Sequence, residues 1–152
     1  MGVNVISTTR SIVKIISGGQ TGADRAGLDA AKYLGIETGG YAPLNYYTEY
    51  GAKLNVKQSD ATVIFCSKCN SSGTKNTIET CKNFFKPFIV NPTDLELVRF
   101  IDKHNVKVLN VAGNRHSIDP KIYAVTYNTI VSALSGKFIE KHNQSTLSIF
   151  YE

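Results

Sequence analysis

The sequence predicts an α/β protein with a Rossmann-like parallel sheet flanked by helices on both faces. Four apolar runs rich in β-branched residues end at or beside a Gly, Ser or Asn, and a helical pattern follows each of them. Strands that are apolar on both faces and alternate with helices are typical of a parallel sheet covered on both sides. We expect strands, joined by right-handed crossovers, at residues 12–17, 61–66, 88–91 and 106–112.

Four helices are expected between and after these strands, and their ends carry capping residues. Gly35 stands where a left-handed C-terminal cap of the first helix belongs, and Thr93 and Glu96 have the spacing of a capping box. Asp119 as cap and Pro120 as first helical residue are expected to begin the last helix. The expected helices span residues 23–34, 74–85, 93–103 and 120–134.

The remaining segments have weaker patterns. Residues 39–58 are irregular and rich in Tyr and Asn, as in a surface loop with a short helix. Residues 1–11 are expected to be a disordered lead-in, and alternating apolar residues at 147–151 indicate an edge strand in a C-terminal tail at 137–152. We expect residues 1–152 to form a single Rossmann-like ligand-binding domain.

The composition limits the classes of function to consider. No apolar run approaches the roughly 18 residues that span a membrane, and residues 1–11 lack the apolar centre of a secretion signal. A cytoplasmic location without a membrane partner is therefore expected. The formal net charge of +5 favours an anionic partner. Nucleic acid is disfavoured, because the lysines are scattered singly and no aromatic RNA-binding motif is present.

The three cysteines are expected to be reduced thiols, because an odd count in a chain without an export signal does not indicate a disulfide framework. Cys66 and Cys69 have the spacing of half a zinc site or of a redox pair. There is no second pair, and Cys81 and the three histidines add no recognisable ligand spacing. No metal site is predicted.

The sharpest motif lies between the first strand and the first helix, where residues 17–27 read Ser-Gly-Gly-Gln-Thr-Gly-Ala-Asp-Arg-Ala-Gly. Its glycines permit a tight strand-to-helix turn, which needs no ligand to explain it. The unpaired N–H groups at the helix N-terminus would also attract phosphate, so the motif is a candidate phosphate site. Gln20 and Thr21 add donors, and Arg25 adds a two-pronged cation. Asp24 is either an N-terminal cap or a contact for a ligand's hydroxyl or amino group. The motif matches neither the dinucleotide fingerprint nor the Walker sequence.

Two later loops are expected to meet the first one. Residues 71–77 supply small donors beside backbone N–H groups at the start of a helix, although the same residues are also ordinary capping sequence. In residues 113–120, Arg115 is suited to clamp a phosphate with help from Ser117, and His116 is either a solvated loop residue or an acid–base group. Ligands bind beyond the carboxyl ends of parallel strands, so the three loops should converge on one crevice.

Residues 15–31, which read Ile-Ile-Ser-Gly-Gly-Gln-Thr-Gly-Ala-Asp-Arg-Ala-Gly-Leu-Asp-Ala-Ala, closely resemble the opening of the molybdenum cofactor carrier family. The similarity extends to about residue 134 through segments at 39–43, 55–62, 72–77, 86–87 and 109–123. The family belongs with the Lonely Guy and DprA-like Rossmann proteins. The resemblance implies a cytosolic homo-oligomeric carrier, without catalytic residues, that binds molybdenum cofactor, a pterin phosphate.

The ligand site is accordingly expected in the three loops. The chain departs from the family pattern in having Ser72-Gly73 instead of a double glycine, and Asn114 and His116 instead of Pro and Glu. The expected contacts to the small anionic ligand are Gly18, Gly19, Gln20, Thr21, Gly22, Asp24, Arg25, Ser72, Gly73, Thr74, Thr77, Asn114, Arg115 and Ser117.

Two alternatives belong to other functional classes. Lonely Guy hydrolases carry a Gly-Gly-x-Gly-Thr-x-x-Glu motif whose glutamate falls on Thr77 here, and a hydroxyl group cannot replace a carboxylate in glycosidic cleavage. A nucleotide phosphoribohydrolase would need Asp24 or Glu49 as the substitute. The other alternative is a nucleotide-sensing module that signals through its oligomer.

Overall fold

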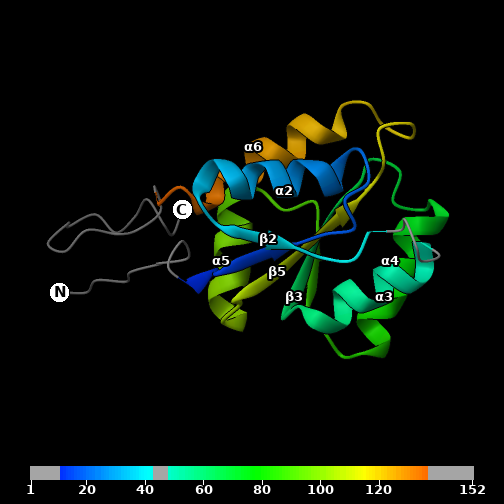
Figure 1. Cartoon of the computed structure of the whole chain (residues 1–152), viewed down its shortest axis with the longest axis horizontal. Coiled ribbons are helices and arrows are strands. Elements are labelled where there is room, and N and C mark those ends of the chain that lie inside the picture. Colours follow the sequence, from blue (N-terminus) through cyan, green and yellow to red (C-terminus); the bar gives the residue numbers. More distant parts are fainter. Residues whose placement is uncertain (1–10, 43–47, 137–152) are drawn as a thin grey trace, which may run out of the picture.

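The computed structural model describes residues 11–42 and 48–136, which form a five-stranded parallel sheet (Figure 1). The strand order is β2-β1-β5-β3-β4, and every pair of neighbours runs parallel. Helices cover both faces, which confirms the predicted α/β, Rossmann-like fold. The strands are β1 (Lys14–Ile16), β2 (Glu37–Gly39), β3 (Ala61–Phe65), β4 (Phe88–Val90) and β5 (Val108–Gly113).

The helices carry most of the caps that the sequence predicts. Gly35 ends the first of them in the left-handed conformation, and the Thr93–Glu96 capping box is formed in both directions. These caps satisfy backbone groups that a helix cannot pair internally. The helices are α2 (Ala23–Leu34), α3 (Thr48–Gln58), α4 (Ser72–Asn83), α5 (Asp94–His104) and α6 (Ile122–Leu134).

The structure differs from the sequence prediction at several element boundaries. α6 begins two residues late, because the Asp119 carboxylate accepts the Lys121 N–H at 2.9 Å and holds a turn ahead of the helix. α4 begins and ends two residues early, since Ser71 is its cap. The prediction missed β2, an edge strand of three residues. It also expected only a short helix within the surface loop, where α3 spans 11 residues.

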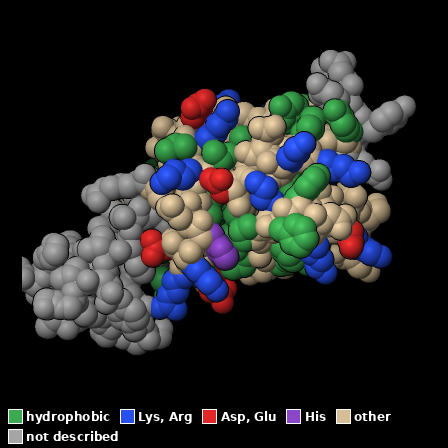
Figure 2. Space-filling view, turned by 90° about the horizontal axis from the view of Figure 1, so that it is seen from below, with side chains coloured by type: hydrophobic (Ala, Val, Ile, Leu, Met, Phe, Trp, Pro, Cys, Tyr) green, Lys and Arg blue, Asp and Glu red, His purple; other side chains and the backbone are tan. Residues whose placement is uncertain are grey.

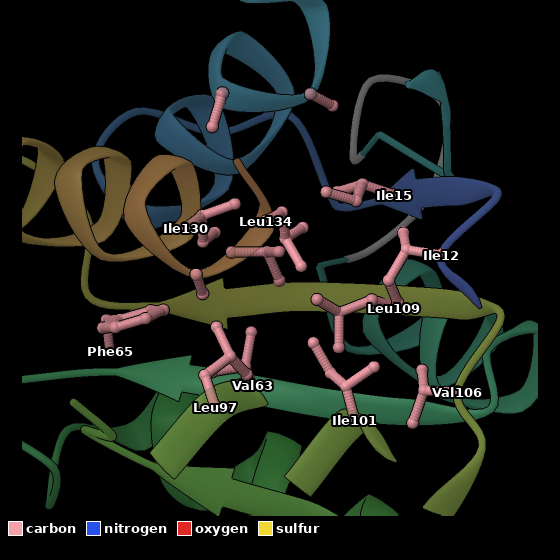
Figure 3. Packing of buried hydrophobic residues seen from close by; sticks show 14 of the residues in the cluster. Ile12, Ile15, Val63, Phe65, Leu97, Ile101, Val106, Leu109, Ile130 and Leu134 are labelled. Carbon is pink, nitrogen blue, oxygen red and sulfur yellow. The ribbon is translucent and has the colours of Figure 1, made fainter. Parts of the chain in front are cut away.

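The apolar core lies between the sheet and helices α2, α5 and α6 (Figure 3). Ile15, Val63 and Leu109 point to this side from three neighbouring strands, and burial of each such side chain contributes about 1.5–3 kcal/mol. The alternate residues of the same strands point to the side covered by α3 and α4. There Asn110 Nδ2 donates to Thr62 Oγ1 at 3.2 Å, so this second layer contains a buried polar pair.

The order of the strands fixes where a ligand can bind. The chain passes from β1 to β2 on one side and then returns to β3, on the far side of β5. This reversal is a topological switch point, where a crevice opens beyond the carboxyl ends of the strands. The loops after β1, β3 and β5 all leave the sheet at that edge.

Some predictions lie outside the described residues. These are the lead-in up to residue 10 and the tail at 137–152 with its expected edge strand. Within the described residues, no helix is long and apolar enough to cross a membrane. On the face shown in Figure 2, Lys and Arg side chains lie among hydrophobic and acidic ones instead of forming one continuous basic stripe.

Candidate functional site

Hydrogen bonds within the chain close the loop between β1 and α2. The Ser17 hydroxyl group accepts the Gly19 N–H and donates to the Asp24 backbone carbonyl, both at 3.1 Å. The Asp24 carboxyl group accepts the Gln20 N–H at 3.3 Å. The expectation that the N–H groups of this loop lack partners is therefore wrong for Gly19 and Gln20, because the side chains of Ser17 and Asp24 accept these N–H groups.

Asp24 faces a pocket instead of capping α2, whose N-cap residue is Gly22. Burial raises the pKa of Asp24 from 3.8 to about 7, although the hydrogen bond from Gln20 and the positive charge of Arg115 offset part of the effect. At neutral pH the carboxyl group is therefore present in both protonation states. It can donate a hydrogen bond as well as accept one.

The third loop, after β5, packs directly against the first. The Ala23 N–H donates to the Asn114 carbonyl oxygen at 3.1 Å, and the His116 N–H donates to Thr21 Oγ1 at 3.3 Å. Gly22 has a φ of 81°, and a Cβ there would overlap the Asn114 carbonyl oxygen, so glycine is required. These contacts confirm that the first and third loops lie at the same edge of the sheet.

The side chain of Asn114 joins the third loop to the second, and only 1% of this residue is exposed. Its Oδ1 accepts the N–H groups of Ser67 and Lys68, both at 3.0 Å. Its Nδ2 lies 3.1 Å from the Lys68 carbonyl oxygen and 3.3 Å from both Ser71 Oγ and Thr74 Oγ1. One amide group therefore holds the turn after β3 and the start of α4 in place.

The N-terminus of α4 presents backbone donors to the same crevice. Ser71 Oγ accepts the Thr74 N–H at 3.4 Å, and the Lys75 N–H donates to the Ser71 carbonyl oxygen. The N–H groups of Ser72 and Gly73 form no hydrogen bond with any described residue. Two such donors, together with the positive end of the helix dipole, suit an anion.

These elements surround a pocket of about 250 Å³ at the carboxyl ends of β1 and β5. Residues of the first loop, α3, the start of α4 and β5 line it. Asn55 of α3 ties down the lining residue Tyr41, since its Oδ1 accepts the Tyr41 N–H at 2.8 Å and its Nδ2 donates to the Tyr41 carbonyl oxygen at 3.2 Å. The pocket lies where the sheet topology predicts a ligand site.

Comparison with known proteins assigns this architecture to a family. Residues 15–53 and 51–134 match the model of the circularly permutated YpsA SLOG family, which is more than half of the chain. The chain belongs to this family. A crystal structure from Syntrophus aciditrophicus SB, named "Putative molybdenum carrier protein", is 30% identical, covers 82% of this chain and 95% of its own, and superimposes with a TM-score of 0.69. No curated protein matches.

The pocket of this SLOG family member brings together residues from all three predicted loops. The predicted residues that line it are Gly18, Gln20, Asp24, Ser72, Gly73, Thr74, Thr77, Asn114 and Arg115. Those that do not line it are Gly19, Thr21, Gly22, Arg25 and Ser117. Contact of any of these residues with a ligand stays a prediction.

Arg25 is an exposed residue of α2 that does not line the pocket. The Tyr123 hydroxyl group of α6 donates to the Asp29 carboxylate at 2.6 Å, and this bond raises the pKa of Tyr123 to about 12. The positive charge of Arg25 offsets part of that rise. Of the two arginines predicted in the site, Arg115 is the one that lines the pocket.

Several pocket residues were missed from the sequence. Asn110 carried a usable signal, since it is a polar residue within the apolar run of β5 and is 3% exposed. Asn76 belongs to the second motif at 71–77 but was not among the expected contacts; it lies on the first turns of α4 and lines the pocket. Asn55 and Tyr41 lie in segments that resemble the carrier family, but the irregular pattern around them gave no reason to place them in the site.

The cysteines differ from the expectation of reduced thiols. Cys66 and Cys69 form a disulfide, because the turn after β3 brings their Cα atoms to 5.1 Å, within the range that a disulfide spans. Cys81 is a free, buried thiol, as expected. In the part of the chain that the structure describes, no group of three or more His, Cys, Asp or Glu side chains is placed to hold a metal ion.

Proposed function

We propose that this chain binds a phosphate-bearing pterin or nucleotide in the pocket and carries it without cleaving it. Molybdenum cofactor is the first ligand to consider, because of the name of the similar Syntrophus protein and because this pterin carries a phosphate. The strongest support for the proposal is that Ser72, Gly73 and Arg115 line one pocket. The backbone N–H groups of the first two pair with no described residue, and Arg115 carries a guanidinium group.

The phosphate is expected at the start of α4. The N–H groups of Ser72 and Gly73, which pair with no described residue, can donate there, and Arg115 is an exposed lining residue that can add a charge-assisted bond. Two donors of the first loop, the N–H groups of Gly19 and Gln20, are engaged by Ser17 and Asp24. The anion is therefore assigned to the start of α4, and Gly18, Gln20 and Asp24 of the first loop line the same pocket.

The heterocycle is expected toward the first loop and β5. Pterins and guanine share an edge of ring N–H, amino and carbonyl groups. A carboxyl group that holds a proton in part of the molecules, such as Asp24, can pair with either kind of group, and Asn110 adds an amide. A volume of about 250 Å³ suits one phosphorylated heterocycle better than a dinucleotide.

A nucleotide phosphoribohydrolase is the second candidate, and Asp24 is the observation that favours it. A carboxyl group with a pKa of about 7 in a pocket is suited to general acid–base catalysis. Against this function, Thr77 stands at the position of the hydrolase glutamate, and its hydroxyl group donates to the Gly73 carbonyl oxygen at 3.1 Å. The side chain of Glu49 lies outside the part of the chain that the structure describes.

Guanosine 5′-monophosphate distinguishes the two functions, since it combines a pterin-like edge with a phosphate and a cleavable glycosidic bond. We expect the protein to retain the nucleotide on a desalting column and to release no guanine above the buffer background, as measured by liquid chromatography. A carrier needs only binding, whereas cleavage needs a correctly placed carboxylate.

Two variants make the result decisive. Asp24→Asn removes the pocket carboxyl group, and Glu79→Gln removes an exposed carboxylate of α4 as a matched control. Guanine release by the wild-type protein that disappears in Asp24→Asn and persists in Glu79→Gln would establish the hydrolase instead. Failure to retain any nucleotide would count against the pocket as the site.

A further inference from the structure

The Cys66–Cys69 pair occupies the turn that leads from β3 to α4. Cys66 directly follows β3, and its backbone is held on both sides by the side chain of Asn91. The Cys66 N–H donates to Asn91 Oδ1 at 2.8 Å, and Asn91 Nδ2 donates to the Cys66 carbonyl oxygen at 2.7 Å. The same Nδ2 lies 3.7 Å from Cys69 Sγ. One end of the turn is therefore anchored to the sheet, and an amide donor stands beside the other sulfur.

The two sulfur atoms differ in accessibility. Cys66 is 2% exposed, whereas Cys69 is partly exposed and follows the exposed residues Ser67 and Lys68. A small thiol in solution can therefore reach Cys69 but not Cys66.

The turn that the disulfide closes is connected to the pocket. The N–H groups of Ser67 and Lys68 lie inside the four-residue ring, and both donate to Asn114 Oδ1. The Nδ2 of the same side chain reaches Ser71 Oγ and Thr74 Oγ1 at the start of α4. A change in the turn is therefore transmitted by one buried amide group to the residues that carry the unpaired N–H donors.

We propose that Cys66 and Cys69 form a reversible dithiol–disulfide couple that changes the geometry of the pocket through Asn114. The disulfide holds the 66–69 turn in the shape that Asn114 binds, and reduction removes that constraint. The effect on a bound ligand rests on the proposed function, whereas the redox reaction and its effect on α4 do not.

The reaction partner is a low-molecular-weight thiol. Its thiolate attacks Cys69 Sγ, which breaks the Cys66–Cys69 bond, forms a mixed disulfide and leaves Cys66 as a thiolate that takes up a proton. A second small thiol attacks the mixed disulfide at the small-molecule sulfur and releases Cys69 as a thiolate, which also takes up a proton. Two small thiols are oxidised to one disulfide, and two electrons and two protons pass to the protein.

The test uses the full chain without ligand in glutathione buffers of increasing oxidised-to-reduced ratio. Thiols are alkylated in denaturant after acid quenching and counted by mass spectrometry, and amide resonances are recorded in matched samples. We expect two alkylation sites, mapped to Cys66 and Cys69, to appear in the reducing buffers and to disappear when oxidised glutathione is restored. The amide resonances of Ser72, Gly73 and Thr74 are expected to shift with the same midpoint.

Two cysteine variants test whether the redox transition and the shifts of the α4 resonances both depend on the Cys66–Cys69 pair. Cys69→Ser should lose the transition and keep the α4 resonances at one position in every buffer, whereas Cys81→Ser, which removes the buried thiol of α4, should keep both responses. A folded chain whose disulfide resists reduced glutathione, or whose thiols stay reduced in oxidised glutathione, would overturn the reversible couple. A complete transition that leaves the Ser72–Thr74 resonances unmoved would overturn the connection to the pocket.

Discussion

Replacing Asn114 with Ala is expected to lower the free energy of unfolding by about 3 kcal/mol. The change leaves the backbone contacts of residue 114 intact and removes an amide that is 1% exposed and serves the turn after β3 and the cap of α4 together. The N–H groups of Ser67 and Lys68 would then lose their acceptor. Urea denaturation followed by circular dichroism measures the loss.

Asn70→Ala is the matched control for this change. Asn70 belongs to the same connection between β3 and α4 but is exposed, so its replacement should change the free energy of unfolding by no more than about 0.5 kcal/mol. Equal losses in the two variants would show that the Asn114 amide does not hold the loops together.

The free energy of unfolding is expected to fall as the pH rises from about 4 to about 7, because of Asp24. The folded-state pKa of this carboxyl group is about 7, against 3.8 for an unperturbed Asp. Between these values the folded chain keeps a proton that the unfolded chain has released, so raising the pH favours unfolding. One such group gives a slope of at most about 1.4 kcal/mol per pH unit, and the slope vanishes above the folded-state pKa.

The contribution of Asp24 to this pH dependence is isolated by measuring urea midpoints of the wild-type protein and of two variants across the same pH range. Asp24→Asn should flatten the profile, since its side chain has no proton to lose. Asp102→Asn, which changes an exposed carboxylate of α5, should keep the wild-type slope. The account of Asp24 is wrong if Asp24→Asn and the wild-type protein have parallel profiles.

Patterns that depend on neighbouring residues allowed most of the fold to be predicted. The range of α2, its Gly35 cap and the Thr93–Glu96 capping box all follow from local sequence, and all are present in the structure. β2 was missed because its three residues, Glu37–Gly39, have no apolar run and gain their strand conformation from pairing with β1. The length of α3 was missed because its sequence has little apolar periodicity.

For the candidate site, the sequence predicted that the three loops converge at one edge of the sheet. The glycine at position 22 and the motif at 71–74 indicated tight turns and helix starts; in the structure Gly22 packs against the Asn114 carbonyl oxygen, and residues 71–74 line the pocket. Which polar groups face the pocket could not be predicted, because this depends on contacts distant in sequence. Asp24 lines the pocket and also accepts the Gln20 N–H of its own loop, whereas Arg25 does not line the pocket.

The most direct test of the phosphate site is a titration with inorganic phosphate followed by the amide resonances of the whole chain. The account predicts shifts at Ser72, Gly73 and Thr74 that saturate together. Arg115→Ala should weaken binding by about 1.5–3 kcal/mol, or roughly 10- to 150-fold, whereas Arg25→Ala should leave the affinity within about a factor of two. Shifts confined to Gly18–Gly22, or an affinity that depends on Arg25 and not on Arg115, would contradict the account.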